Sequence, residues 1–210
     1  MTVRRILLGS LVTNCYLLIF SDRVAVIDPG DTPEKILRFC EDLPITDILL
    51  THGHIDHTGA LGDLCDRFSP RVYLHENDEE FLNSNPLRCP GTDDYNPAWR
   101  TDFACTHRLK DRDEIRLGGD GEQVVLTVLH TPGHTPGSSC FHWEEGGILF
   151  SGDTLFQGTM GRVDFPKGDP AAMQRSLNRL AALPAETKVF PGHGFSTTIG
   201  KEGWIGGQLF

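Results

Sequence analysis

The feature that most constrains this chain is a cluster of ligand-type side chains directly after a short apolar segment. Residues 51–57 read T-H-G-H-I-D-H, so three imidazoles and one carboxylate fall within six consecutive positions. The apolar segment at 45–50 before them has the length of a buried strand. Zinc-type ions favour imidazole nitrogen and carboxylate oxygen as ligands. We therefore expect a strand that ends in a metal-binding loop, with a merely histidine-rich polar turn as the weaker alternative.

The composition is that of a soluble globular protein. The chain has 210 residues, of which 39% are hydrophobic and 23% charged, and this length allows a single substantial core. Its formal net charge of -10 repels a phosphate backbone, so we expect no nucleic-acid partner. No apolar run reaches the length of a membrane span, so we expect no membrane partner either.

The cysteines and the N-terminal segment indicate a cytoplasmic protein. The six cysteines are scattered and form no C-x-x-C pair, which is typical of reduced thiols rather than of a disulfide framework. The apolar run at 6–20 superficially resembles a signal peptide, but polar residues at 13–14 interrupt it and no small-residue cleavage site follows. We expect a two-stranded hairpin there instead, followed by a strand at 24–27.

The order of the remaining expected elements predicts two sheets sandwiched between helices. A helix is expected to begin with Thr32 as N-cap and Pro33 in its first turn, and another pattern of helical spacing follows Asp56. The segment at 83–106 has no period and is expected to be an active-site loop or a surface crossover. The other expected elements are strands at 72–74, 114–117, 124–129, 140–143, 148–150 and 188–190 and helices at 77–82 and 170–183.

A strand followed by a glycine and a histidine occurs three times. The pairs are Gly53-His54, Gly133-His134 and Gly192-His193. Glycine allows the backbone to turn sharply and to pass close to a site. We therefore expect three loops to deliver histidines along one edge of the two sheets.

Five motifs, in this order, carry a resemblance to a known family. They are T-H-G-H-I-D-H at 51–57, T-P-G-H-T-P-G at 131–137, S-G-D-T at 151–154, G-R-V-D-F at 161–165 and P-G-H-G at 191–194. With them the chain resembles the metallo-β-lactamase-fold hydrolases, and among these the glyoxalase II-like, or hydroxyacylglutathione hydrolase-like, branch. The chain ends soon after the last motif, so the C-terminal helical domain of glyoxalase II is expected to be missing.

The resemblance implies the fold and the metal ligands. The implied fold is α/β (α+β), an αββα four-layer sandwich, in a single domain over 1–210 with pseudo-repeated halves at about 1–110 and 111–210. Two divalent metal ions are implied, with zinc as the first choice and iron or manganese as alternatives. Asp56 and Asp153 are the implied catalytic residues. The implied ligands are His52, His54 and His134 for one ion, Asp56, His57 and His193 for the other, and Asp153 as the bridge together with a water or hydroxide.

The implied activity is hydrolysis of a small-molecule thioester or ester. S-lactoylglutathione, another acyl-thioester and a small ester are the candidate substrates. A thiolate leaving group, with a thiol pKa of about 8.5, hardly needs a strong general acid. A mono-iron persulfide dioxygenase of the same fold is the alternative, and a non-catalytic metal-binding domain is the remote one. A true β-lactamase is disfavoured because Asp153 stands where the commonest such enzymes place a cysteine. The oligomeric state is left open.

Three further residues have two interpretations each. Arg162 could bind a substrate carboxylate or pair with Asp164 or Asp169. Asp28 could orient a ligand or cap a turn. His130 lies near His134 and could support it, whereas the remaining histidines, at 75, 107 and 142, match no motif.

Overall fold

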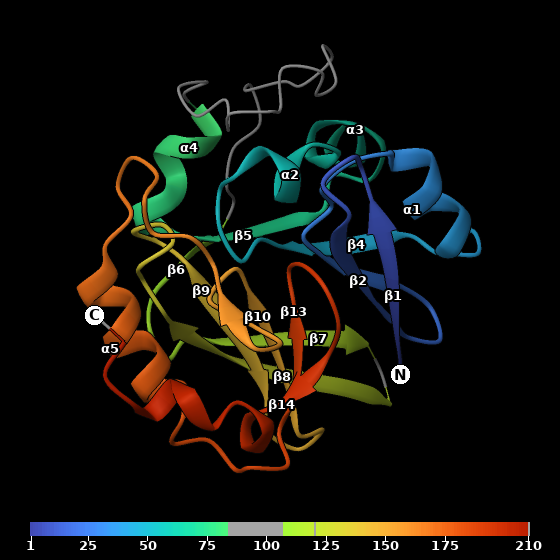
Figure 1. The fold of residues 1–210 in the computed structure, drawn as a ribbon. Coiled ribbons are helices and arrows are strands. Elements are labelled where there is room, and N and C mark those ends of the chain that lie inside the picture. Colours follow the sequence, from blue (N-terminus) through green and yellow to red (C-terminus); the bar gives the residue numbers. More distant parts are fainter. Residues whose placement is uncertain (84–106, 120, 210) are drawn as a thin grey trace.

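The protein is described by a computed structural model in which residues 1–83, 107–119 and 121–209 are placed. Two six-stranded sheets face each other, and helices cover the outer face of each (Figure 1). The segment expected to be an active-site loop or a crossover, at 83–106, lies outside the described residues from position 84 onward.

The first sheet is built from the N-terminal half of the chain. Its first three strands are antiparallel, whereas each later pair is parallel. The strands, in spatial order, are β1 (Thr2–Leu8), β2 (Thr13–Ile19), β3 (Val24–Ile27), β4 (Ile45–Leu49), β5 (Arg71–His75) and β6 (His107–Leu109). The helices beside this sheet are α1 (Pro33–Phe39), α2 (Ile55–Thr58), α3 (Leu61–Phe68) and α4 (Glu79–Asn83), the last preceded by the 3-10 turn η1 (Glu76–Asp78).

The second sheet is built from the C-terminal half. Its strands, in spatial order, are β14 (Thr197–Thr198), β13 (Lys188–Pro191), β10 (Ile148–Gly152), β9 (Ser139–Trp143), β8 (Glu122–His130) and β7 (Glu114–Gly119). The helix α5 (Pro170–Leu180) covers its outer face (Figure 1). The remaining elements are a small hairpin of β11 (Leu155–Phe156) and β12 (Thr159–Met160) and two 3-10 turns, η2 (Ile199–Lys201) and η3 (Gly203–Gly206).

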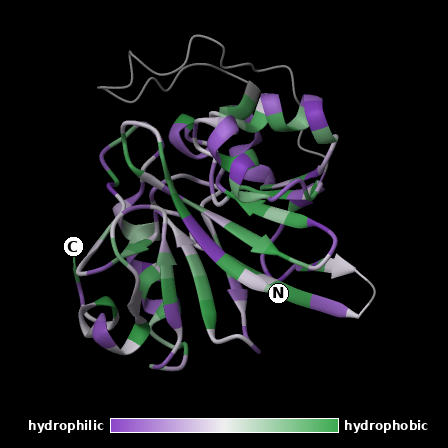
Figure 2. Cartoon of the chain, turned by 90° about the vertical axis from the view of Figure 1, so that its right-hand side faces the viewer, coloured by the Kyte–Doolittle hydropathy of each residue, from purple (hydrophilic) through white to green (hydrophobic). Residues whose placement is uncertain are grey.

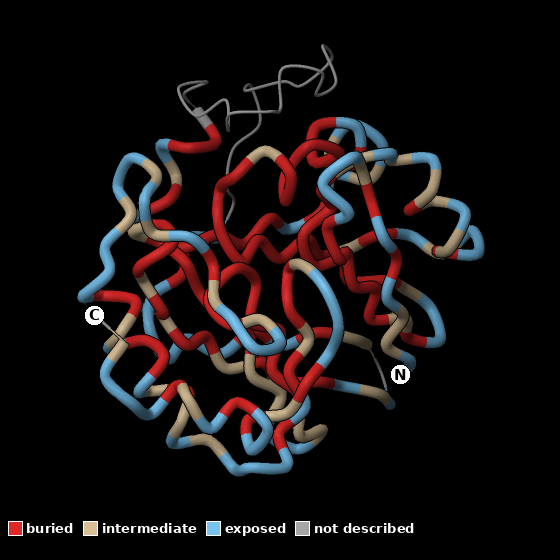
Figure 3. The backbone as a smooth tube through the Cα atoms, in the orientation of Figure 1, coloured by how far each residue is buried: buried red, intermediate tan, exposed pale blue. Residues whose placement is uncertain are grey.

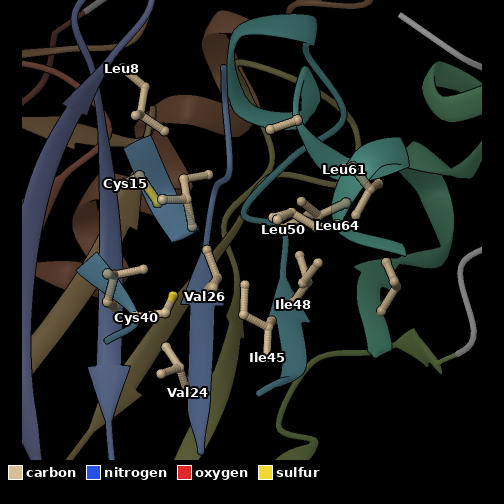
Figure 4. Packing of buried hydrophobic residues seen from close by; sticks show 14 of the residues in the cluster. Leu8, Cys15, Val24, Val26, Cys40, Ile45, Ile48, Leu50, Leu61 and Leu64 are labelled. Carbon is tan, nitrogen blue, oxygen red and sulfur yellow. The ribbon is translucent and has the colours of Figure 1, made fainter. Parts of the chain in front are cut away.

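Three separate apolar clusters lie between the four layers of structure. The first joins the outer helices to the first sheet, and Figure 4 shows part of it. The second fills the space between the two sheets, and the third joins the second sheet to α5. Representative members are Leu50, Leu61 and Leu64 of the first, Leu18, Leu126 and Phe141 of the second, and Met173, Leu177 and Val189 of the third. This confirms the predicted αββα sandwich.

The distribution of hydrophobic residues explains these layers. Hydrophobic residues run along the strands of both sheets, whereas the outer helices also carry hydrophilic stretches (Figure 2). The strands at the centre of the molecule are buried and the peripheral turns are exposed (Figure 3). The strand β2 is buried along nearly its whole length because one of its faces contacts the helices and the other contacts the opposite sheet.

Most expected elements are present, and the differences have local reasons. Thr32 does not cap α1 with its side chain, because its backbone is left-handed (φ 49°), whereas Asp169 caps α5 by accepting from the amide of Ala172. The helix expected at 170–183 ends at Leu180. The strands β6, β11, β12 and β14 were not expected, since two or three residues are too few to show a period.

The strand directions bring the ligand loops to one edge. The strands β3, β4 and β5 run parallel to one another. The strands β8 and β10 are both antiparallel to β9, and β10 is parallel to β13, so these three also share a direction. Two backbone hydrogen bonds tie the sheets together at this edge, from the amide of Asn14 to the carbonyl of Gly192 at 2.7 Å and from Ser139 to Thr51 at 2.9 Å. In sheets with parallel strands, ligands commonly bind at the carboxyl ends of the strands.

The cysteines and helices of the described part bear on two further expectations. Cys15, Cys40 and Cys140 are free thiols, as expected, whereas Cys89 and Cys105 lie outside the placed residues. None of the placed helices combines the length and the apolar character that crossing a bilayer requires.

Candidate metal centre

The first group of ligand atoms consists of three imidazole nitrogens. His54 Nδ1 lies 3.1 Å from His52 Nε2 and 2.9 Å from His134 Nε2. The loop after β4 supplies His52 and His54, and the loop after β8 supplies His134. Nitrogens bound at about 2.0–2.1 Å to a tetrahedral ion lie roughly 3.4 Å apart, so these three atoms form a triangle close to that size. They can together hold one cation.

The second group consists of a carboxylate and two imidazoles. Asp56 Oδ2 lies 3.1 Å from His193 Nε2 and 3.5 Å from His57 Nε2. The short helix α2 carries Asp56 and His57, and the loop after β13 carries His193. These three side chains can hold a second cation.

Asp153 lies between the two groups. Its Oδ1 is 3.3 Å from His57 Nε2, and its Oδ2 is 3.6 Å from both His134 Nε2 and His193 Nε2. His57 Nε2 and Asp153 Oδ1 are buried, and neither has a hydrogen-bond partner among the described residues. A buried polar atom without a partner is costly, and a bound cation would satisfy both atoms. The donor set therefore fits the metal ions that the sequence predicts.

The histidines are oriented by hydrogen bonds from their other ring nitrogens. The Nδ1 atom of His134 donates to the carbonyl of Arg162 at 2.7 Å, and that of His193 donates to the carbonyl of Leu11 at 3.2 Å. The His57 Nδ1 atom donates to Asp28 Oδ2 at 2.9 Å. Each bond fixes the tautomer in which Nε2 is free to bind a cation.

Asp28 therefore has an orienting role as well as a turn position. Its Oδ1 accepts from the Thr51 amide at 2.8 Å, and its Oδ2 accepts from the Thr51 hydroxyl at 2.7 Å. The carboxylate thus joins the ends of β3 and β4 to His57. The Asp28 backbone is left-handed, with φ 53°, an uncommon conformation that asparagine and aspartate tolerate best.

Burial and mutual proximity set the charges of the cluster. Burial lowers the pKa of His52 well below its usual value and that of His54 to about 3, so both rings are neutral, as ligands must be. Burial opposes ionisation of Asp153, but the His57 imidazole holds its pKa well below the usual range. The pKa of His57 is raised, against the effect of burial, by Asp56 and Asp153. The first group thus offers neutral nitrogens, whereas the carboxylates around His57 attract positive charge to the second.

Position 192 requires a glycine because its backbone passes close to two ligand side chains. A Cβ atom at this position would lie 2.2 Å from Asp153 Oδ1 and 2.7 Å from His57 Cε1. Only a residue without a side chain lets the loop after β13 pass this close to the two ligands.

The structure pairs Arg162 with Asp164. Two parallel hydrogen bonds of 2.7 Å join the side chains, and the guanidinium lies 3.8 Å from the centroid of the Phe165 ring. Asp169, the other expected partner, caps α5 instead. The Arg162 side chain is half exposed, and its role in binding a substrate carboxylate stays a prediction.

The remaining histidines lie apart from the ligand groups. His130 stacks on His75 with ring centroids 3.9 Å apart and donates from Nε2 to the carbonyl of Pro136, within the loop that carries His134. His107 contacts the ring of Tyr73. These contacts join His130 to the loop that carries His134 but to none of the ligand side chains, so its supporting role stays a prediction.

Aromatic side chains that sequence reasoning missed flank the cluster. The rings of Phe81 and Phe165 lie 5.7 and 6.1 Å from the His54 ring, and that of Phe156 lies 5.9 Å from the His193 ring. The G-R-V-D-F motif contained Phe165, but nothing in the sequence placed the other two rings beside the ligands.

Comparison with known proteins finds relatives that are described as hydrolases. It is 34% identical over 199 residues to a probable metallo-hydrolase of Bacillus subtilis, YqgX, covering 93% of this chain and 92% of that protein. It is also 34% identical over 200 residues to the hydroxyacylglutathione hydrolase GloC of Haemophilus influenzae, covering 90% of this chain and 89% of GloC.

Solved structures show the same fold. The B3 metallo-beta-lactamase BLEG-1 superposes with a TM-score of 0.86 at 35% identity, covering 96% of each chain. TTHA1623, solved in a di-iron-bound form, superposes with a TM-score of 0.79 at 40% identity, covering 95% of this chain and 96% of its own. The profile of the metallo-beta-lactamase superfamily matches residues 8–193. The chain belongs to the metallo-beta-lactamase superfamily.

Proposed function

We propose that the protein is a binuclear metal-dependent hydrolase that cleaves a thioester or a small ester. The position of Asp153 is the observation that carries the proposal. Its two carboxylate oxygens face histidines of both ligand groups, at 3.3 Å from His57 and 3.6 Å from His134 and His193. A carboxylate in this position suits two neighbouring cations that act together.

In this proposal each residue keeps the role that the family resemblance implies. One cation would be held by His52, His54 and His134, and the other by Asp56, His57 and His193, with Asp153 available to both. Two divalent cations would lower the pKa of a coordinated water and polarise the carbonyl of the substrate. Zinc is the first choice, and the likeness to a di-iron-bound structure supports iron as its main rival.

In this proposal the carboxylates of Asp56 and Asp153 would orient the attacking water. Asp56 Oδ2 accepts a hydrogen bond from the Thr13 hydroxyl at 3.3 Å, and the same oxygen faces His57 and His193, so Thr13 helps to aim it at the site. Asp153 is ionised and can accept a hydrogen bond from a water at the centre of the cluster. Both are therefore proposed as the catalytic carboxylates.

A thioester is the substrate class that the surroundings favour. The rings of Phe81, Phe156 and Phe165 offer apolar contacts beside the ligands, and these suit an acyl chain or a sulfur atom. The likeness to GloC, which this chain matches over most of its length, supports S-lactoylglutathione or a related acyl-thioester.

We further propose that the enzyme works in the cytoplasm. The buried thiols of Cys15, Cys40 and Cys140 are free in the fold, and this usage suits a reducing compartment. Fractionation of the source cells, followed by immunodetection, tests the location. Recovery outside the cytoplasm would contradict it.

Metal analysis followed by a substrate panel tests the function. Protein purified without added metal is expected to contain close to two divalent ions per chain. The highest kcat/KM is expected on S-lactoylglutathione, another acyl-thioester or a small aryl ester, with a β-lactam as the contrast. One iron per chain, together with oxygen uptake on glutathione persulfide, would overturn the proposal in favour of a dioxygenase. Full metal loading without turnover of any substrate would make the protein a non-catalytic metal-binding domain.

A further inference from the structure

Asp78 is a fully buried carboxylate that touches both loops of the first ligand group. It lies at the end of η1, and its side chain has no exposed surface. Its Oδ2 accepts from the amide of Gly53 at 3.0 Å and from the hydroxyl of Thr135 at 2.7 Å. Its Oδ1 accepts from the amide of Gly137 at 2.6 Å. Three donors from two loops thus converge on one side chain.

The donors belong to residues that stand directly beside metal-ligand candidates. Gly53 separates His52 from His54, and Thr135 follows His134. The two loops come from different sheets and from positions about 80 residues apart, as the contact between His54 and His134 shows. Asp78 therefore holds together the two backbone segments on which the first ligand triangle depends.

Close packing makes this arrangement specific. A Cβ atom on Gly137 would lie 2.6 Å from Asp78 Oδ1, so the loop can approach the carboxylate only because that position is glycine. The Thr135 hydroxyl also lies 2.7 Å from the Ser138 hydroxyl, and the Ser138 oxygen accepts from the Thr135 amide. The loop that carries His134 is thus fixed directly after that histidine.

We propose that Asp78 is a positioning residue, which sets the spacing of His52, His54 and His134 by bonding the backbone of both loops. The inference rests on the proposed metal site, because it concerns the affinity of that site for one of its two ions. Partners that orient metal ligands typically contribute about 10- to 100-fold in metal affinity. Asp78 is expected to fall in this range although it contacts no ligand side chain.

Asp78→Asn is the informative variant. The amide has the shape of the carboxylate, but one of its two ends is an NH2 donor. In either orientation that end faces a backbone N–H, from Gly53 or Gly137, so at least one of the loop contacts becomes repulsive. Thr135→Val, which removes only the hydroxyl donor, is the milder second variant if Asp78→Asn does not fold.

Glu202→Gln is a matched control. Glu202 is also a buried carboxylate with three donors, from the Thr197 hydroxyl, the Trp204 indole and the Gly158 amide. It joins the β11–β12 turn to the C-terminal 3-10 turns and contacts neither loop of the first ligand triangle. It therefore reports the general cost of disturbing a buried carboxylate.

The experiment consists of two titrations of the metal-free proteins. Co²⁺ is added stepwise and its binding is followed by the visible absorption of the bound ion. Zn²⁺ is added in competition with a chromophoric chelator, which gives the affinity. His134→Ala and His193→Ala serve as references for damage to the first and second groups. Asp78→Asn is expected to weaken one equivalent about 10- to 100-fold, with the Co²⁺ spectrum changed as in His134→Ala. Thr135→Val is expected to weaken the same equivalent by a smaller factor. Glu202→Gln is expected to leave both the affinity and the spectrum unchanged.

Each outcome decides one question. If Asp78→Asn binds both equivalents as the wild type does, or if Glu202→Gln loses the same equivalent, the positioning role is wrong. If the wild-type protein itself binds fewer than two equivalents, the proposed function fails instead. Thermal unfolding of the metal-free variants separates a loss of affinity from a loss of fold.

Discussion

The Nδ1 atom of His57 lies 2.9 Å from Oδ2 of Asp28, and this bond joins two parts of the cluster that are 29 residues apart. The same carboxylate accepts from the amide and the hydroxyl of Thr51, directly before the first ligand. One side chain at the end of β3 thus orients the start of the histidine loop and its last member.

Replacement of Asp28 by asparagine is expected to weaken metal binding without removing a ligand. The amide cannot accept all three hydrogen bonds, so His57 loses its fixed tautomer, and affinity falls about 10- to 100-fold. Zinc competition titration measures the change. Asp22→Asn, at an exposed position paired with Arg23, is the control, and equal affinities in the two variants would contradict the orienting role.

Replacement of Asp153 by alanine is expected to remove metal and most activity. The change deletes both oxygens that face His57, His134 and His193, so kcat/KM on the best substrate should fall by more than about 100-fold, the upper value for outer-shell partners. His107→Ala, at an exposed position beside Tyr73, should change little. Elemental analysis and kinetics check both, and an equal loss in the two variants would mean that the ligand assignment is wrong.

Replacement of Gly192 by alanine is expected to disturb the centre by overpacking. The new methyl group would press on Asp153 and His57 and cost about 1–3 kcal/mol of unfolding free energy, together with a loss of bound metal. Gly203→Ala, which meets nothing within 4 Å, is the control. Urea denaturation and metal content measure the two effects. A Gly192→Ala protein with wild-type metal content would show that the loop can move aside.

The stacked pair of His75 and His130 predicts a pH dependence of stability. Burial, and then the charge of His130, lower the pKa of His75 to about 4, below its value in the unfolded chain. The unfolded chain therefore binds more protons between pH 6.5 and 4, so stability falls as the pH drops through this window and levels off below it. The contribution is about 1–3 kcal/mol.

The variant His75→Gln tests this dependence. Glutamine does not titrate, so the metal-free variant should lose less unfolding free energy between pH 6.5 and 4 than the metal-free wild type. Urea denaturation at several pH values, with a chelator present in both samples, keeps the metal ligands in the same state. Parallel pH curves for the two proteins would assign the acid sensitivity to other groups.

The parts of the fold that could be predicted are those with a strong local pattern. The strand before the histidine cluster and the β-branched strand β8 have clear apolar runs, and turn residues bound them. The Thr32 cap failed because the composition of a helix start does not specify the backbone angle of its first residue. The short strand β6 forms only by pairing with β5, which no local pattern reveals.

The residues of the site likewise divide into those that a local sequence pattern revealed and those that it did not. Motifs identified the candidate ligands, because each motif contains a glycine and lies at or directly after the end of an expected strand. Asp78 had no such signal, since a single aspartate in an acidic turn reads as a solvated residue. Its importance depends on two loops that approach it from elsewhere in the chain. The partner of Arg162 stayed open between Asp164 and Asp169 for the same reason.

The two backbone bonds between the sheets, from Asn14 to Gly192 and from Ser139 to Thr51, have a consequence for how the molecule folds. They close loops of more than 80 residues, and such distant pairings form slowly because chain entropy must be lost first. Neither half alone can collect a full ligand set, so tight metal uptake begins only after the sheets dock. The rate at which a refolding chain binds metal should therefore equal the rate at which the two sheets dock, the last step of folding.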